Sequence, residues 1–190
     1  MKLTDIWGIM LNNRAKAGSQ QVLEKLQINN GDVIADVGSG GGYFVFEFAR
    51  RVKNEGKVFA VDTNTDLLRF INKRSQKQEI QNVVTIVADK SGFNLSDENC
   101  NLIFLRNVFH HIDNAEVYFR NIQEHLKPNG RIAIIEWLNQ NGANGCHSTS
   151  ELKICKVMET AGYKRINSFD FLQNQSFNIF VLNSALAKNS

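Results

Sequence analysis

The chain has 190 residues, of which 43% are hydrophobic and 22% are charged, a composition typical of a globular protein. This length predicts a single domain over residues 1–190, with a core over 17–183 and a lid or strap over 1–16. The formal net charge of +3 is small, and no run of Lys or Arg is long enough for a nucleic-acid-binding arm. Nucleic acid is therefore not an expected partner.

The cysteines and the apolar stretches bear on the cellular compartment. Cys100, Cys146 and Cys155 form no C-x-x-C pair, and an odd, small number of cysteines argues against a disulfide framework. The apolar stretch at residues 6–11 is too short for a signal-peptide core or a membrane span. We therefore expect a cytoplasmic protein without a membrane span, while the oligomeric state stays open.

The first half of the chain is predicted to alternate helices and strands, because helical apolar spacing gives way repeatedly to short β-branched runs. Asn29, Asn30 and Gly31 end the first helix, and Asp62 and Asp89 follow the second and third strands. The expected elements are a helix over 17–26, a strand over 33–37, a helix ending near 54–56, a strand over 57–61, a helix around 67–71 and a strand over 83–87.

The second half continues this alternation and then departs from it. The expected elements are a strand over 101–105, a helix over 117–126, a turn over 127–130 around the only proline, a strand over 131–137, a polar loop over 138–148, a helix over 149–161, and strands over 165–171 and 177–181. The short connection around Asn174 predicts an antiparallel hairpin. The fold class is therefore α/β, a doubly wound, mostly parallel seven-stranded sheet with a C-terminal antiparallel hairpin.

A glycine-rich turn follows the first strand, in the sequence VIADVGSGGGYFVFEF over residues 33–48. Such a turn leaves backbone N–H groups and a helix N-terminus open to a ligand. The G-x-G-x-x-G pattern of dinucleotide folds requires a glycine where Tyr43 stands, which disfavours a nicotinamide oxidoreductase. The turn instead reads D-x-G-x-G-x-G, with Asp36, Gly38, Gly40 and Gly42.

This D-x-G-x-G-x-G turn resembles the first motif of the class I S-adenosylmethionine-dependent methyltransferases. The stretch LRNVFHHI over 105–112 is similar to the ubiquinone- and menaquinone-biosynthesis branch and its small-molecule relatives. The resemblance covers about residues 20–182 and implies a Rossmann-like sheet, S-adenosyl-L-methionine as cofactor, and methyl transfer to a small-molecule acceptor. A carboxylate beside the turn also suits the ammonium of this cofactor.

The resemblance assigns the cofactor contacts to the ends of the first four strands. Asp36 is expected to hold the ammonium, Asp62 to accept hydrogen bonds from the ribose hydroxyls, and Asp89 to accept one from the adenine amino group. The full set of expected cofactor residues is Asp36, Gly38, Ser39, Gly40, Gly42, Asp62, Thr63, Ala88, Asp89, Lys90, Arg106 and Asn107.

Two adjacent histidines follow the fourth strand. His110 is the candidate general base, and a structural histidine is the alternative; for His111 the structural interpretation is favoured. No H-E-x-x-H or other metal-ligand spacing is present, and Cys146, His147 and Cys155 do not form one, so no metal is expected. Trp137, after the fifth strand, is expected either to form a wall of the acceptor pocket or to pack under the following loop.

Two rival functions share part of this pattern. A non-catalytic protein that binds S-adenosylmethionine or S-adenosylhomocysteine, as a sensor or partner subunit, has the same sequence features, and only an activity assay separates it from an enzyme. An RNA methyltransferase is disfavoured by the weak charge and the lack of interleaved aromatic and basic residues. Acceptor specificity is expected to come from residues 1–16, 109–115 and 138–150, and fold analogy does not name the acceptor.

Overall fold

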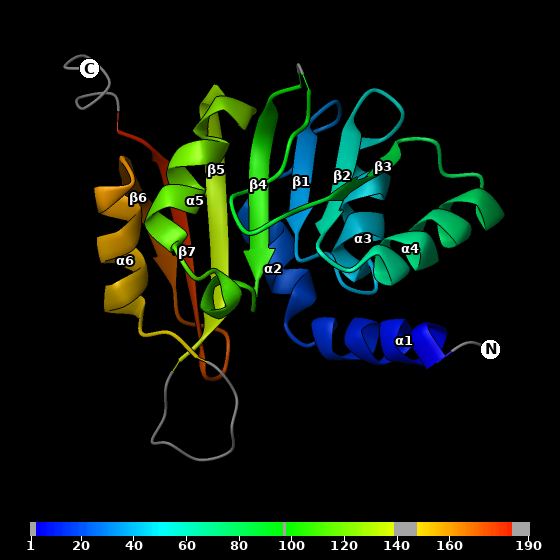
Figure 1. Cartoon of the computed structure of the whole chain (residues 1–190), viewed down its shortest axis with the longest axis horizontal. Helices are drawn as coiled ribbons and strands as arrows, with labels where there is room; N and C mark the ends of the chain where they lie inside the picture. Colours follow the sequence, from blue (N-terminus) through cyan, green and yellow to red (C-terminus); the bar gives the residue numbers. More distant parts are fainter. Residues whose placement is uncertain (1–2, 97, 139–147, 184–190) are drawn as a thin grey trace.

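The computed structural model describes residues 3–96, 98–138 and 148–183, and its strands form a seven-stranded sheet in the order β3-β2-β1-β4-β5-β7-β6 (Figure 1). The strands are β1 (Val33–Val37), β2 (Lys57–Asp62), β3 (Val83–Val87), β4 (Cys100–Arg106), β5 (Leu126–Trp137), β6 (Tyr163–Phe169) and β7 (Gln175–Leu182). The first five are parallel, and β7 runs antiparallel to both β5 and β6. The predicted fold class is confirmed.

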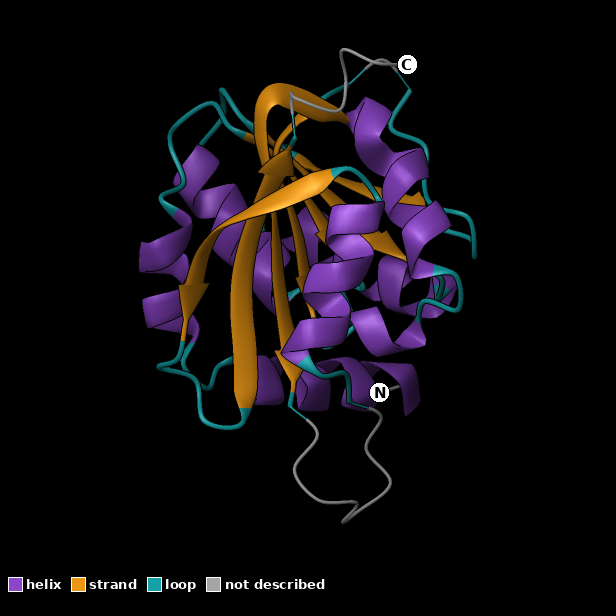
Figure 2. Cartoon of the chain, turned by 90° about the vertical axis from the view of Figure 1, so that its left-hand side faces the viewer, coloured by secondary structure: helices purple, strands orange, loops and turns teal. Residues whose placement is uncertain are grey.

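Helices cover both faces of the sheet (Figure 2). They are α1 (Leu3–Ala15), α2 (Ser19–Leu26), α3 (Tyr43–Val52), α4 (Thr65–Lys77), α5 (Ala115–Asn121) and α6 (Glu151–Thr160), with short 3₁₀ helices η1 (Phe109–His111) and η2 (Ile122–His125). Buried residues of α2, α3 and α4 form one core layer with the sheet, and those of α5, η2 and α6 form the other. This two-layer burial is what the alternating order of elements dictates.

Aromatic packing fixes α3 against the centre of the sheet. The ring of Phe104 in β4 lies 4.7 Å from that of Phe44 and 5.3 Å from that of Phe48, measured between centroids. All three side chains are buried. Each contributes about 1.5–3 kcal/mol through burial. Because α3 begins directly after the glycine turn, this packing also holds the turn at the carboxyl end of β1.

The expected turn over residues 127–130 is wrong, because these residues belong to β5. Cys100 of β4 pairs with Leu126 and Leu102 pairs with Arg131, so the residues between them on β5 form an irregular bulge. Pro128 is exposed within it. A bulge tolerates a residue that lacks an N–H donor, which a regular central strand does not. The turn chemistry was present in the sequence, but the chain stays in the sheet.

The terminal hairpin is confirmed, with shifted boundaries. β6 begins at Tyr163 and β7 at Gln175, each two residues before the expected start. Tyr163 has its ring fully buried, and its hydroxyl donates to the Phe119 carbonyl at 2.8 Å. Propensity does not reveal such a contact between distant segments, so strand ends are poorly predicted from local sequence.

Candidate cofactor and acceptor site

A cavity of about 1670 Å³ opens at the carboxyl ends of β1, β2 and β4, next to α1. Its walls come from the glycine turn, from the loops after β2, β3 and β4, from α1, and from the connection between β6 and β7. Sites for one drug-sized ligand usually measure about 300–1,000 Å³. The cavity therefore has room for a large cofactor and a second small molecule.

The glycine turn is shaped by positive φ angles and close contacts. Gly38, Gly40 and Gly42 have φ angles of 69°, 53° and 80°, which side chains with a Cβ rarely adopt. A Cβ on Gly38 would overlap the Val108 side chain, and one on Gly42 would lie 2.8 Å from Ile71 Cγ1. The Gly38 amide donates to the Val61 carbonyl at 2.8 Å, which ties the turn to β2. The backbone angles and these close contacts therefore favour glycine in this turn, whether or not a ligand is bound.

Asp62 joins the end of β2 to the glycine turn. Its Oδ2 accepts a hydrogen bond from the Gly40 amide at 2.9 Å, and its Oδ1 accepts one from the Asn64 amide at 2.9 Å. Asp62 and Thr63 both line the cavity. Each carboxylate oxygen accepts more than one hydrogen bond, so these two contacts fix the orientation of Asp62 and leave acceptor capacity for hydroxyl groups of a ligand.

Asp36 is a buried carboxyl group at the carboxyl end of β1, and it also lines the cavity. Burial, and then the nearby charge of Asp62, raise the pKa of Asp36 well above its usual range, against a smaller opposing effect of the Val45 amide. A cation in the cavity would stabilise the ionised form of Asp36. The site is therefore electrostatically suited to an ammonium.

Ala88, Asp89 and Lys90 follow β3 and line the same cavity. The Asp89 Oδ1 accepts hydrogen bonds from the Ser91 and Gly92 amides at 2.7 and 3.1 Å. Hydrogen bonds from the Ser91 hydroxyl and amide lower the pKa of Asp89, so it is ionised at neutral pH. Lys90 pairs with Asp113 across 3.3 Å in an exposed ion pair.

Arg106 and Asn107, after β4, tie several distant segments to the cavity wall. Arg106 donates to the Ala15 and Ala17 carbonyls at 2.9 and 2.8 Å, which anchors the linker between α1 and α2. Gln175 bridges the two residues, because its Oε1 accepts from Arg106 at 3.2 Å and its Nε2 donates to Asn107 Oδ1 at 2.6 Å. These contacts hold α1 and the start of β7 beside the cofactor turn.

The helix α1 lies near the carboxyl ends of the central strands (Figure 1). Trp7, Leu11 and Asn12 contribute to the cavity wall. Gly8 packs against Gly41 so closely that a Cβ on Gly41 would overlap the Gly8 carbonyl oxygen. The N-terminal segment thus borders the cavity, as either a lid or a strap would.

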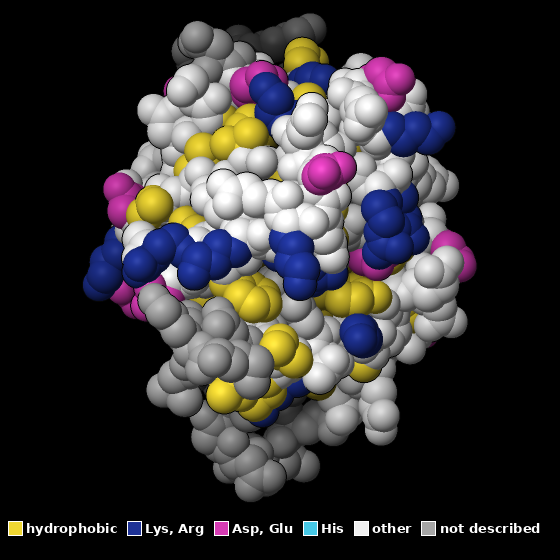
Figure 3. All heavy atoms as spheres, turned by 90° about the vertical axis from the view of Figure 1, so that its right-hand side faces the viewer, with side chains coloured by type: hydrophobic (Ala, Val, Ile, Leu, Met, Phe, Trp, Pro, Cys, Tyr) yellow, Lys and Arg dark blue, Asp and Glu magenta, His cyan; other side chains and the backbone are white. Residues whose placement is uncertain are grey.

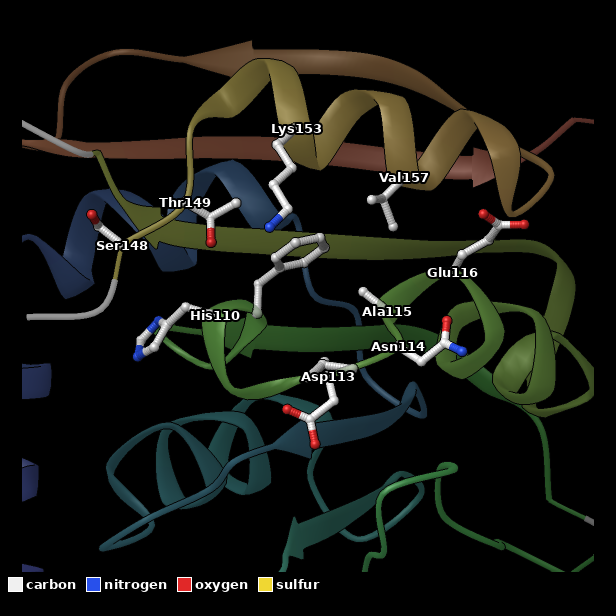
Figure 4. Close-up of a pocket in the computed structure, with 11 residues that line it drawn as sticks. His110, Asp113, Asn114, Ala115, Glu116, Ser148, Thr149, Lys153 and Val157 are labelled. Atoms are coloured by element: carbon white, nitrogen blue, oxygen red, sulfur yellow. The ribbon is translucent and has the colours of Figure 1, made fainter.

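His110 lies beside a second cavity of about 340 Å³, between η1 and α6. Figure 4 shows His110 at one end of this cavity, and the Lys153 side chain extends from α6 into the cavity. His110 Nδ1 lies 3.0 Å from Glu136 Oε2, and the same oxygen accepts from the His110 amide at 3.2 Å. Glu136 is fully buried at the end of β5. This carboxylate favours the tautomer that has its proton on Nδ1.

The structure brings most of the sequence-predicted cofactor residues to one cavity. Gly42 is the exception, since it packs behind the turn. His111 lines the large cavity, and its ring centroid lies 4.0 Å from that of His110, which lines the smaller one. Trp137 also lines the large cavity and is 40% exposed.

Sequence reasoning missed two residues of the site, Glu136 and Gln175. The sequence signal for Glu136 was its position directly after the apolar run at residues 132–135, where burial is expected. Charged residues are rarely buried without a partner. Gln175 carried no sequence signal, because its role depends on contacts with Arg106 and Asn107.

Among the described residues, no group of three or more His, Cys, Asp or Glu side chains is placed to hold a metal ion. Cys146 and His147 lie outside the described residues. None of the helices in residues 3–96, 98–138 and 148–183 combines the length and apolar character that a bilayer crossing requires.

A doubly wound, seven-stranded sheet that ends in an antiparallel hairpin, with a glycine turn after β1, is the architecture of the class I methyltransferases. A family model described as a methyltransferase domain matches residues 28–187. The chain belongs to this methyltransferase-domain family.

The sequence identity between this chain and the individual relatives is below 30% in the three examples that follow. The chain is 29% identical over 58% of its length to (S)-coclaurine N-methyltransferase of Thalictrum flavum, and it spans only 30% of that protein. It is 23% identical over 86% of its length to a ubiquinone/menaquinone biosynthesis C-methyltransferase of Neisseria meningitidis, and spans 69% of it. A SAM-dependent methyltransferase from Aquifex aeolicus has the same fold, with a TM-score of 0.75 at 21% identity, covering 85% of this chain and 87% of that one.

Proposed function

We propose that the protein transfers the methyl group of S-adenosyl-L-methionine to a small-molecule acceptor that lies between His110 and Trp137. The observation that supports this most directly is the large cavity, because the glycine turn, Asp36, Asp62 and Asp89 all border it. Family membership supports the cofactor. Trp137 and His111 line this cavity, and the His110 ring lies 4.0 Å from the His111 ring, which supports the position of the acceptor.

The chain's own residues are suited to hold this cofactor. Asp36 would hold the ammonium, Asp62 the ribose hydroxyls and Asp89 the adenine amino group, while the glycine turn leaves room for close approach of the ligand. When bound, the cofactor supplies a methyl group on a positively charged sulfur, which leaves as a neutral thioether. The protein then has mainly to orient the acceptor and exclude water, and orientation alone contributes about 7–11 kcal/mol.

His110 is proposed as the general base for an acceptor that must lose a proton, such as a hydroxyl group or an acidic carbon. A proton on Nδ1, directed to Glu136, would make Nε2 the basic nitrogen of the ring. Glu136 would act as a positioning residue, because it orients the ring and stabilises the imidazolium that forms.

Calorimetric titration with S-adenosylhomocysteine tests the cofactor site. We expect one ligand per chain, and loss of binding in Gly40→Val and in Asp62→Ala. Valine at Gly40 opposes the φ of 53° and adds atoms on a surface that faces Leu11. Asp66→Ala is the matched control, since Asp66 is an exposed acid on α4 that pairs with Arg69. Preferential binding of NAD would contradict the proposal.

Methyl-transfer assays against a panel of phenols, amines and acidic carbon compounds test the chemistry. For a phenol or carbon acceptor, His110→Ala is expected to lower kcat by about 100- to 10,000-fold, with the affinity for S-adenosylhomocysteine unchanged. Glu136→Gln is expected to lower kcat by less, and Glu124→Gln is the control, because Glu124 is exposed and lines neither cavity. Unchanged turnover in His110→Ala would refute the base, and tight cofactor binding without turnover on any acceptor would favour the non-catalytic alternative.

A further inference from the structure

The helix α1 turns large apolar side chains toward solvent. Ile6, Trp7, Ile9 and Met10 are 48%, 42%, 46% and 43% exposed, and we call them the α1 patch. Residues at these spacings share one side of a helix. A surface helix normally turns its apolar side chains to the core. Contacts within the chain therefore do not account for this patch.

The opposite side of α1, which meets the protein, carries Gly8, Leu11 and Asn12. Gly8 is buried there against Gly41, Leu11 lines the cavity, and Asn12 has a buried Oδ1 without a hydrogen-bond partner. The helix thus has apolar side chains on both sides, and four of its large ones lie on the outer side. Such an arrangement is costly in water unless another apolar phase covers the patch.

Basic residues border the α1 patch. Arg14 and Lys16 follow it along the chain and are exposed. Lys73 is exposed on α4, which packs on α1 through Phe70 and Gly8. The acids of these two helices are Asp5, which precedes the patch on α1, and Asp66, which pairs with Arg69 on α4. Figure 3 shows a row of Lys and Arg side chains above hydrophobic side chains on this side of the molecule.

We propose that the α1 patch docks the protein on the surface of an anionic lipid bilayer. A helix that places apolar side chains into the interface and Lys or Arg at the level of the phosphates is bound by both apolar burial and charge. Trp7 suits this position, because tryptophan is enriched where one end of the ring is in an apolar phase and the other is hydrated.

A second copy of the chain fits the α1 patch less well. In a two-fold dimer through this patch, both copies would bring to the interface the same excess of basic over acidic residues on α1 and α4, and a net charge of one sign on both sides is unfavourable. The anionic headgroups of a bilayer complement these borders, and its acyl chains accept protruding side chains without a matched surface.

The α1 patch is continuous with the large cavity, because Trp7 belongs to both. A bilayer bound to the patch would therefore lie beside the cavity. If the proposed function holds, acceptors dissolved in the bilayer would reach the site from there. Vesicle binding needs no methyl transfer, so the docking proposal and the proposed function fail independently.

Cosedimentation with vesicles tests the docking. We expect the full chain to bind phosphatidylcholine–phosphatidylglycerol vesicles, to bind them less at high salt, and to bind pure phosphatidylcholine vesicles weakly. The triple variant Ile6→Ser, Ile9→Ser and Met10→Ser is expected to lower binding by at least about tenfold. The matched control is Val117→Ser, Leu152→Ser and Ile166→Ser, which removes exposed apolar side chains elsewhere and should bind as the wild type does.

Three results would overturn the proposal. They are no binding of the wild-type chain to anionic vesicles, equal losses in the patch and control variants, and a wild-type dimer in solution that the patch variant dissociates. Should the patch variant fail to fold by circular dichroism, Lys16→Glu with Lys73→Glu replaces it. That charge reversal leaves the apolar residues intact and is expected to weaken binding to anionic vesicles only; unchanged binding would also overturn the proposal.

Discussion

At the scale of single residues, Asp36 shows how a binding site lowers the stability of its own protein. Burial and the nearby Asp62 raise the pKa of Asp36 in the folded chain, so the folded state favours the protonated form more than the unfolded state does. The free energy of unfolding therefore falls as the pH rises from the ordinary carboxyl pKa through the raised value. Above the ordinary carboxyl pKa, Asp36 therefore lowers the stability of the unliganded protein, and a bound ammonium would offset this effect.

Replacing Asp36 with Asn should accordingly raise the stability of the unliganded protein and weaken its binding of the cofactor. We expect Asp36→Asn to raise the free energy of unfolding of the unliganded protein at neutral pH, and to flatten its fall between acid and neutral pH. The same variant should bind S-adenosylhomocysteine more weakly, because the amide does not compensate an ammonium. Urea unfolding at several pH values measures the first effect and calorimetry the second.

A less stable Asp36→Asn protein at neutral pH would show that the carboxylate is compensated within the folded chain. Asp66→Asn again supplies the control, since that side chain is half exposed and its ion pair with Arg69 lies on the surface. Exposed pairs of this kind contribute about 0–1 kcal/mol, so its stability should hardly change.

At the scale of elements, the contact between α1 and the glycine turn decides the shape of the cavity. Gly8 of α1 lies on Gly41, and Arg106 holds the linker that follows α1 through the Ala15 and Ala17 carbonyls. Helices on the surface are stabilised mainly by tertiary packing and not by propensity. The position of α1 therefore depends on these few contacts.

Gly41→Ala is expected to displace α1 and to weaken binding of S-adenosylhomocysteine, because the new Cβ would overlap the Gly8 carbonyl oxygen. Hydrogen exchange of the α1 amides should become faster, while that of the β4 and β5 amides should not change. The comparison is Gly8→Ala, whose Cβ would meet only the Phe70 ring at 2.9 Å, a side chain that can move. Equal exchange rates in wild type and Gly41→Ala would show that α1 is held by other contacts.

At the scale of the whole molecule, ligand binding and folding are coupled. The cavity draws its walls from α1, from the carboxyl ends of β1 to β5 and from the β6–β7 connection, so a ligand in it contacts segments from much of the described chain. A ligand that binds the folded state alone adds about 2.7 kcal/mol to the free energy of unfolding at 100 times its Kd.

S-adenosylhomocysteine at that concentration should therefore raise the Tm by about 5 to 10 °C for a domain of this size. NAD at the same concentration should leave the Tm unchanged, and Asp62→Ala should abolish the shift. Differential scanning fluorimetry measures all three. A Tm shift with NAD and none with S-adenosylhomocysteine would contradict the proposed cofactor.

Local pattern was sufficient for the fold class and for most of the strand-end residues that line the large cavity. Val33–Val37 reads as a buried strand, the glycines at 38, 40 and 42 demand positive φ, and Asp62 and Asp89 directly follow strands. Alternating strands and helices imply a parallel sheet, and parallel strands have their carboxyl ends at one edge. The sequence therefore predicts that these residues lie close together. The region around Pro128 shows the limit, because turn residues there form a bulge inside β5.

The sequence by itself therefore determined the class of fold, the cofactor turn and the acids at the strand ends, since each is encoded within a few consecutive residues. The tertiary structure alone decided that Glu136 orients His110, that Gln175 joins Arg106 to Asn107, and that four large apolar side chains of α1 lie exposed. These features join segments that are distant along the chain. No local pattern of propensity or spacing reports such contacts, because they exist only after the sheet has brought the segments together.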